Sequence, residues 1–163
     1  MINKWLFLFF FVSALAVLQA GLRQISWLTG FNIIVVFAIV TVLRADYKET
    51  AFIVILSGLI LDFYSGLPDG ILTLSLIITA YLVFILSRSL LEPYSGLAVL
   101  FALTIAGILC FNLLVWLLSW MISSYSFAVV AKILAEIITT IVLVPAAVWF
   151  FELKNKIWTH FAN

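Results

Sequence analysis

The sequence predicts an all-helical integral membrane protein, a bundle of about six transmembrane helices. Hydrophobic residues make up 67% of the 163-residue chain and charged residues 9%, whereas soluble proteins average roughly 45–50% apolar and about 25% charged residues. The apolar residues also gather into runs that approach the length of about 20 residues needed to cross a bilayer as a helix. No polar stretch is long enough for a separate soluble module, so residues 1–163 are expected to form a single membrane domain.

Six apolar runs are the candidate spans, separated by charged residues, Gly or Pro. They run from about Trp5 to Leu22, Trp27 to Leu43, Thr50 to Leu61, Gly70 to Leu86, Gly96 to Trp120 and Phe127 to Phe151. The third run is too short to cross about 30 Å at 1.5 Å per residue unless the helix continues through Asp62, Phe63 and Tyr64. Asp62 is therefore expected within a turn of a helix end, near one membrane face. The short connections make successive helices antiparallel neighbours.

Lysine and arginine residues set the expected orientation, because acidic residues contribute little to the positive-inside rule. With the N-terminus inside, the outer side holds only Arg23 and Lys132. The cytoplasmic side then holds the clear majority, namely Lys4, Arg44, Lys48, Arg88, Lys154 and Lys156. We therefore expect both termini in the cytoplasm and the connection 62–70 outside. The first run, with a lysine before it and small residues at its end, has features of a secretory signal, but we expect it to be retained as a span.

The charge and the reactive residues argue against several classes of function. The net charge of +1 and the scattered basic residues disfavour nucleic-acid binding. Cys110 is the only cysteine and His160 the only histidine, so neither an internal disulfide nor a metal centre is expected. No nucleophile with its base, no carboxylate pair and no nucleotide-binding loop is apparent. We therefore expect a protein that is not an enzyme and carries no cofactor.

The segment 57–70 interrupts the apolar pattern with a carboxylate and a cluster of turn residues. An ionisable group beside hydrocarbon is costly, and it is usually kept for a function or placed at the interface. Gly58 and Asp62 are four residues apart, so they share a helix face on which the glycine permits close approach of a neighbouring helix. Gly66, Pro68 and Gly70 then provide a turn. Two interpretations stay open: a packed corner that a partner or ligand recognises, or a helix end with a hydrated Asp62.

This region resembles the signature region of the rod shape-determining protein MreD family. The segment GLILDFYSGLPDGILTLSLIITAYLV carries a glycine, an aspartate at a helix end, and glycines around a short turn that leads into an apolar helix, and Gly58, Asp62, Gly66 and Gly70 match that pattern. The preceding FNIIVVFAIVTVLRADYKETAFIVILSG resembles the second and third helices of the family, so the resemblance covers roughly residues 30–90. Asp69 departs from the pattern, because the family more usually has an apolar or small residue there, and it is expected to be an ordinary turn residue.

The resemblance implies both a fold and a function. The fold would be similar to the substrate-binding subunits of energy-coupling-factor vitamin transporters. The function would be that of a non-enzymatic inner-membrane component of the bacterial cell-elongation machinery, which helps maintain rod shape. Its partners would be an MreC-like membrane protein, an MreB-like actin homologue and the elongation wall synthases, together with membrane lipid. Gly58, Asp62, Gly66 and Gly70 would form the motif that contacts the partner.

A vitamin-binding subunit of such a transporter is the alternative function. It would need polar and aromatic residues that converge on a pocket at the outer face. The sequence offers few there: Asp62, Tyr64, and Lys132 with Glu136.

Lys132 and Glu136 form the second polar feature within an apolar run. Their i to i+4 spacing puts them on one helix face, where pairing would lower the cost of burying either charge. They are predicted to form an intramembrane ion pair. In one interpretation the pair makes a polar contact with another helix or a partner, or forms a site for a proton or a ligand. In the other, Lys132 extends to the outer interface and Glu136 is paired to it.

Overall fold

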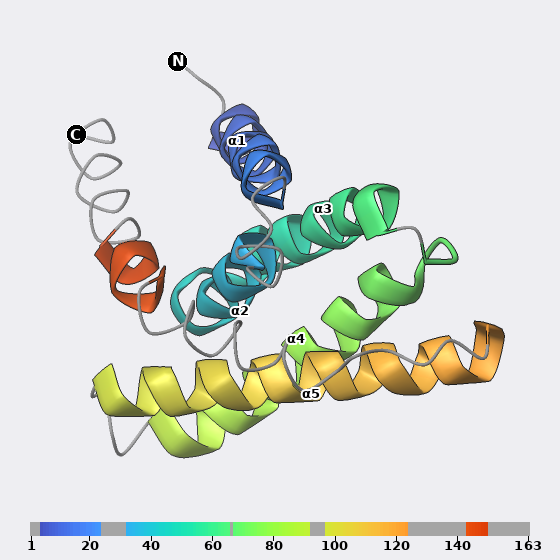
Figure 1. Cartoon of the computed structure of the whole chain (residues 1–163). Helices are drawn as coiled ribbons and strands as arrows, with labels where there is room; N and C mark the ends of the chain where they lie inside the picture. Colours follow the sequence, from blue (N-terminus) through green and yellow to red (C-terminus); the bar gives the residue numbers. More distant parts are fainter. Residues whose placement is uncertain (1–3, 24–31, 66, 92–96, 124–142, 150–163) are drawn as a thin grey trace.

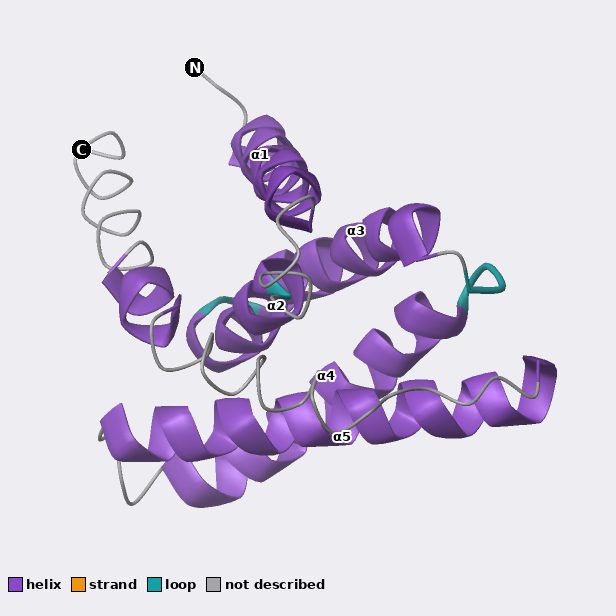
Figure 2. Cartoon of the chain, in the orientation of Figure 1, coloured by secondary structure: helices purple, strands orange, loops and turns teal. Residues whose placement is uncertain are grey.

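The computed structural model describes residues 4–23, 32–65, 67–91, 97–123 and 143–149. All regular structure within these residues is helical (Figure 2). The helices are α1 (Lys4–Arg23), α2 (Ile33–Arg44), α3 (Tyr47–Ser65), α4 (Ile71–Leu91) and α5 (Leu97–Ser123), and residues 143–149 form a further short helix. The all-helical class predicted from the sequence is thus confirmed for the part of the chain described here.

The helix boundaries follow the predicted runs closely where they can be compared. α1, α4 and α5 begin and end within a few residues of the first, fourth and fifth runs, except that α4 extends to Leu91. α3 continues past Asp62 to Ser65, as the length of the third run requires, and it begins earlier than expected, at Tyr47. The predicted start of the second run and most of the sixth run lie outside the described residues, as do Gly66, Lys132 and Glu136.

α2 is the central helix of the described bundle. Its ten residues from Ile33 to Val42 are all buried, and it packs against α1, α3, α4 and α5. A helix that is apolar on every side needs such surroundings. α4 packs against both α3 and α5, and a short connection joins α3 to α4 at the right of Figure 1.

Glycine allows the closest of these contacts on α5. A Cβ atom at Gly107 would lie 3.0 Å from Val83 Cγ2 of α4 and 3.1 Å from Ile39 Cδ1 of α2. The small residue therefore lets α5 approach both helices closely, as at many interfaces between membrane helices.

Two of the described helices are long and apolar enough to cross a membrane. The qualifying stretches are Ile71–Arg88 in α4 and Ala98–Ile122 in α5, and 44% of each is buried inside the protein. The remaining side chains form an outer surface that is rich in large apolar residues: Leu74, Ile77, Tyr81, Leu82 and Ile85 on α4, and Leu109, Leu113, Trp116, Leu117 and Trp120 on α5.

Candidate functional site

The end of α3, the described part of the connection after it and the first turn of α4 form one unit, residues 58–65 and 67–73, which we term the α3–α4 corner. Asp62 is buried there, with 8% of its surface exposed. Its carboxylate accepts hydrogen bonds from the backbone N–H of Leu72 (2.9 Å, to Oδ1) and of Thr73 (3.2 Å, to Oδ2), and from the Thr73 hydroxyl. The interpretation of Asp62 as a hydrated helix end is therefore wrong, because donors from α4 surround its carboxylate.

The α3–α4 corner provides a hydrogen-bond acceptor for each of the first four backbone N–H groups of α4. A helix leaves its first four N–H groups without partners inside the helix. In α4 the N–H groups of Leu72 and Thr73 donate to Asp62, that of Ile71 donates to the Pro68 carbonyl at 3.4 Å, and that of Leu74 donates to the Gly70 carbonyl at 2.8 Å. Asp62 thus caps α4 from the preceding helix, where its negative charge also meets the positive end of the helix dipole.

Gly58 brings the two helices together one turn before Asp62. A Cβ atom at this position would lie 2.7 Å from Cα of Thr73, a distance that real Cβ atoms do not adopt. Gly58 and Asp62 therefore face the same turn of α4, as their spacing of four residues predicts. The glycine sets the separation of the helices, and this separation lets the carboxylate reach the α4 amides.

Gly70 completes the reversal of the chain. It has φ +93°, while a Cβ added there would meet nothing within 4 Å, so the backbone conformation and not a lack of space favours glycine. A positive φ at the third position of the turn Pro68–Ile71 is typical of a type II turn. Asp69, at the second position, is exposed, as expected for a turn residue.

Ser65 supports the end of α3. Its hydroxyl donates to the Asp62 carbonyl at 3.1 Å and accepts from the Leu67 N–H at 3.1 Å. The role of this serine was not predicted from the sequence. A serine at the expected end of a helix, next to glycine, is the signal that could have found it, because its hydroxyl can bond to nearby backbone groups.

A second capped helix start lies between α1 and α2, and we term it the α1–α2 corner. Gln19, with 3% of its surface exposed, accepts a hydrogen bond from the Ile34 N–H at 3.0 Å through Oε1. Its Nε2 donates to Oδ1 of Asn32 at 3.0 Å. Neither polar residue was predicted from the sequence to form a cap. A glutamine near the end of an otherwise apolar run is itself a signal, because a buried amide requires partners.

The α1–α2 and α3–α4 corners lie side by side. Gln19 and Ile34 of the first, together with Leu61 and Tyr64 of α3, line a cavity of about 10 Å³. This space is at the lower limit for a single water molecule, so it cannot hold an organic ligand. The two corners therefore form one packed end of the bundle.

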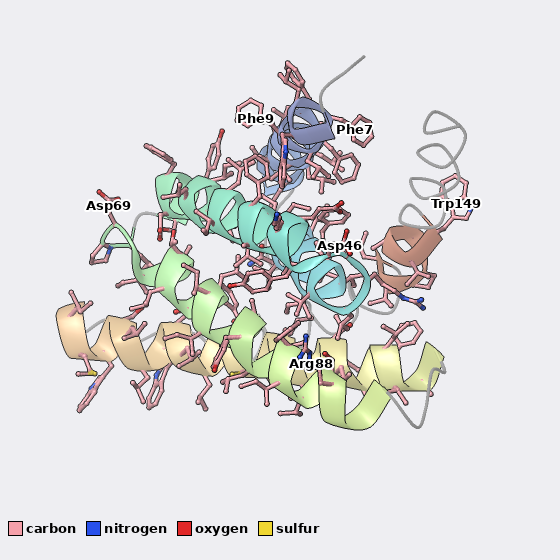
Figure 3. The ribbon with its side chains drawn as sticks, turned by 180° about the vertical axis from the view of Figure 1, so that it is seen from behind. Phe7, Phe9, Asp46, Asp69, Arg88 and Trp149 are labelled. Carbon is pink, nitrogen blue, oxygen red and sulfur yellow. The ribbon has the colours of Figure 1, made fainter. Side chains whose placement is uncertain are left out.

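A larger groove opens on the outside of the α3–α4 corner. It has a volume of about 390 Å³ and is lined by Leu59, Asp62, Phe63, Asp69, Gly70, Thr73, Leu74 and Ile77. Figure 3 shows Asp69 on the connection between α3 and α4, far from Asp46 and Arg88 near the opposite end of these helices. The groove combines apolar walls with two carboxylates, that of Asp62 near the end of α3 and that of Asp69 on the connection.

Few polar side chains line the groove among the described residues. The polar side chains that line it are Asp62, Asp69 and Thr73, and two of these are engaged with each other. Within the described part of the chain, no group of three or more His, Cys, Asp or Glu residues could hold a metal ion. Comparisons of the chain with protein-family models, curated proteins and solved structures give no match.

Proposed function

We propose that this chain is a non-enzymatic, multi-pass protein of the bacterial inner membrane that works in the cell-elongation machinery, as its resemblance to the MreD family implies. The observation that carries the proposal is the role of the matching residues in one corner. Gly58 sets the approach of two helices, Asp62 caps the second helix, and Gly70 reverses the chain. Three of the four residues that carry the resemblance thus cooperate in a single structural unit, and the fourth, Gly66, lies outside the described residues.

Membrane location is supported by the outer surface of α4 and α5. Soluble monomers rarely expose contiguous apolar patches larger than a few hundred Å². Here large side chains such as Leu113 and Trp120 of α5 are more than 60% exposed, as is Tyr81 of α4. Such a surface is suited to hydrocarbon, where exposed apolar side chains carry no penalty. This surface supports the membrane location in our proposal, in which the chain is a six-span bundle whose α3–α4 corner faces outward.

The α3–α4 corner is suited to contact with a protein rather than to catalysis. Its buried carboxylate accepts hydrogen bonds from two backbone amides and a hydroxyl, so it is held in a structural role. Phe63, by contrast, is 88% exposed beside it. In our proposal a rigid corner presents this ring to an MreC-like partner, and the complex links MreB-like filaments inside the cell to the wall synthases outside.

Complementation tests the proposal in a rod-shaped bacterium that lacks its own MreD. The chain is expected to restore rod shape and to co-purify with the MreC-like protein. Phe63→Ala is expected to accumulate normally, because the ring packs against little, yet to lose co-purification. Met121→Ala is the matched control, since Met121 is 68% exposed at the end of α5. Round cells with the wild-type chain would refute the proposal, and tight vitamin binding by the purified protein would favour the transporter subunit instead.

The proposed orientation is tested with reporters that are active only in the periplasm. A reporter inserted after Ser65 is expected to be active, and one fused after Asn163 is expected to be inactive, because the basic residues favour cytoplasmic termini. The opposite pattern would mean that the orientation is inverted, and activity at both positions would require an even number of spans after Ser65.

A further inference from the structure

We infer that the groove beside the α3–α4 corner binds one phospholipid with a primary-amine headgroup, of the phosphatidylethanolamine class. The ammonium group meets Asp69 at the mouth, and an acyl chain follows the walls made by Leu59, Leu74 and Ile77. This inference rests on the membrane location in the proposed function, but not on the role in cell elongation.

The walls of the groove are suited to an acyl chain. Leu59 of α3 and Leu74 and Ile77 of α4 line it, and they are between 40% and 48% exposed. The volume of about 390 Å³ lies within the range of roughly 300–1,000 Å³ that is usual for ligand sites. An acyl chain can pack against such walls, and it carries no hydrogen-bonding group that would need a partner there.

The charge of the groove selects the headgroup. Asp62 and Asp69 both line it, and none of the described residues around it is Lys, Arg or His. The nearby N-terminus of α4 is equivalent to only about half a positive charge, so two carboxylates leave the groove negative. No described residue forms a hydrogen bond or ion pair with the Asp69 side chain. A cation is thus the complementary group, and an anionic headgroup would be repelled.

A primary ammonium fits this site better than a quaternary one. An ammonium carries three N–H donors, as in lysine, whereas a trimethylated nitrogen carries none. Asp69, exposed in the turn, can therefore form a charge-assisted hydrogen bond with ethanolamine but not with choline.

The depth of the groove also matches a lipid. Asp69 belongs to the connection that the basic residues place at the outer face, the level of the headgroups. From Gly70 to Ile77 the walls follow α4 for seven residues, which corresponds to about 10 Å along the helix axis. The headgroup and the upper part of an acyl chain therefore meet the polar and apolar parts of the groove in the right order.

Native mass spectrometry of the full-length protein tests the inference, with phosphatidylethanolamine, phosphatidylcholine and phosphatidylglycerol of identical acyl chains offered together. We expect one phosphatidylethanolamine to be retained in preference to the other two. Asp69→Asn is expected to reduce this preference about tenfold, the scale of one charge-assisted hydrogen bond. Asp46→Asn is the matched control, because Asp46 is equally an exposed acid but lies near the opposite end of α3 (Figure 3).

Three results would overturn the inference. These are equal retention of the ethanolamine and choline lipids, an unchanged preference in Asp69→Asn, and dimers of the chain that exclude lipid from the groove. Free ethanolamine is expected not to displace the lipid, because it lacks an acyl chain. Displacement would mean that the headgroup alone accounts for binding and that the acyl chain does not contribute. A chain that restores rod shape but shows no lipid preference would refute this inference only. A chain that retains the lipid but leaves cells round would refute the elongation role only.

Discussion

The two corners of the bundle cap a helix start in the same way but with different chemistry. In each, a side chain from the end of one helix accepts a hydrogen bond from the first turn of the next. At the α1–α2 corner a neutral amide, Gln19, receives one backbone N–H. At the α3–α4 corner a carboxylate, Asp62, receives two backbone N–H groups and a hydroxyl.

The difference lies in how closely the helices approach. α3 meets α4 at Gly58, where no Cβ atom fits against the Thr73 backbone, so a short aspartate reaches the amides. At the α1–α2 corner the longer glutamine side chain spans the distance to Ile34. A short charged cap thus requires a glycine contact, whereas a long neutral cap does not. Gly58 and Asp62 therefore act together in this segment.

Gly58→Ala is expected to have the largest effect on stability. The new Cβ would clash with the Thr73 backbone and push the Asp62 cap away, so we expect a loss of about 3 kcal/mol in the free energy of unfolding in detergent. Gly21→Ala is the matched control, because a Cβ at this helical glycine meets nothing within 4 Å. It is expected to raise stability by up to about 1 kcal/mol, since alanine favours the helix. A gain of stability in Gly58→Ala like that expected for Gly21→Ala would mean that the α3–α4 contact is not close.

Asp62→Asn is expected to have the second largest effect. The amide keeps one acceptor oxygen but loses the charge and the second acceptor, so we expect a loss of about 2 kcal/mol, measured by the same unfolding assay. Asp62→Ala, which removes every acceptor, should lose more. If Asp62→Asn were as stable as the wild type, the charge would contribute nothing to the cap.

Gln19→Met is expected to have the smallest effect of the three. Methionine has nearly the same length and shape but leaves the Ile34 N–H without its acceptor, so we expect a loss of about 1 kcal/mol. A loss larger than that of Asp62→Asn would mean that the α1–α2 cap contributes more to the free energy of unfolding than the α3–α4 cap. It would show that the neutral cap is the more important one.

The features that depend on local geometry could be predicted from the sequence. Runs of apolar residues located the helices, because a span needs a minimum length. The spacing of Gly58 and Asp62 predicted a shared face, because residues four apart adjoin on any helix. The extension of α3 beyond Asp62 also followed from length alone.

The caps could not be predicted, because they depend on how two helices join. Nothing in the spacing of Asp62 and Leu72 indicates a hydrogen bond across a turn, and the same holds for Gln19 and Ile34. α3 begins slightly before the third apolar run, at Tyr47, for a related reason. Lys48 and Glu49 resemble a polar connection, yet α3 begins before them and Glu49 is only 3% exposed. Hydropathy cannot distinguish a charged connection from a charged first turn.

The direction of the two caps bears on how the chain is made. In both corners the accepting side chain precedes the helix that it caps, by ten residues from Asp62 to Leu72 and by fifteen from Gln19 to Ile34. During synthesis, which proceeds from the N-terminus, each acceptor is therefore present before the amides that need it. Closing such short loops costs little entropy. Each helical hairpin can thus form as soon as its second helix begins, without waiting for the rest of the protein.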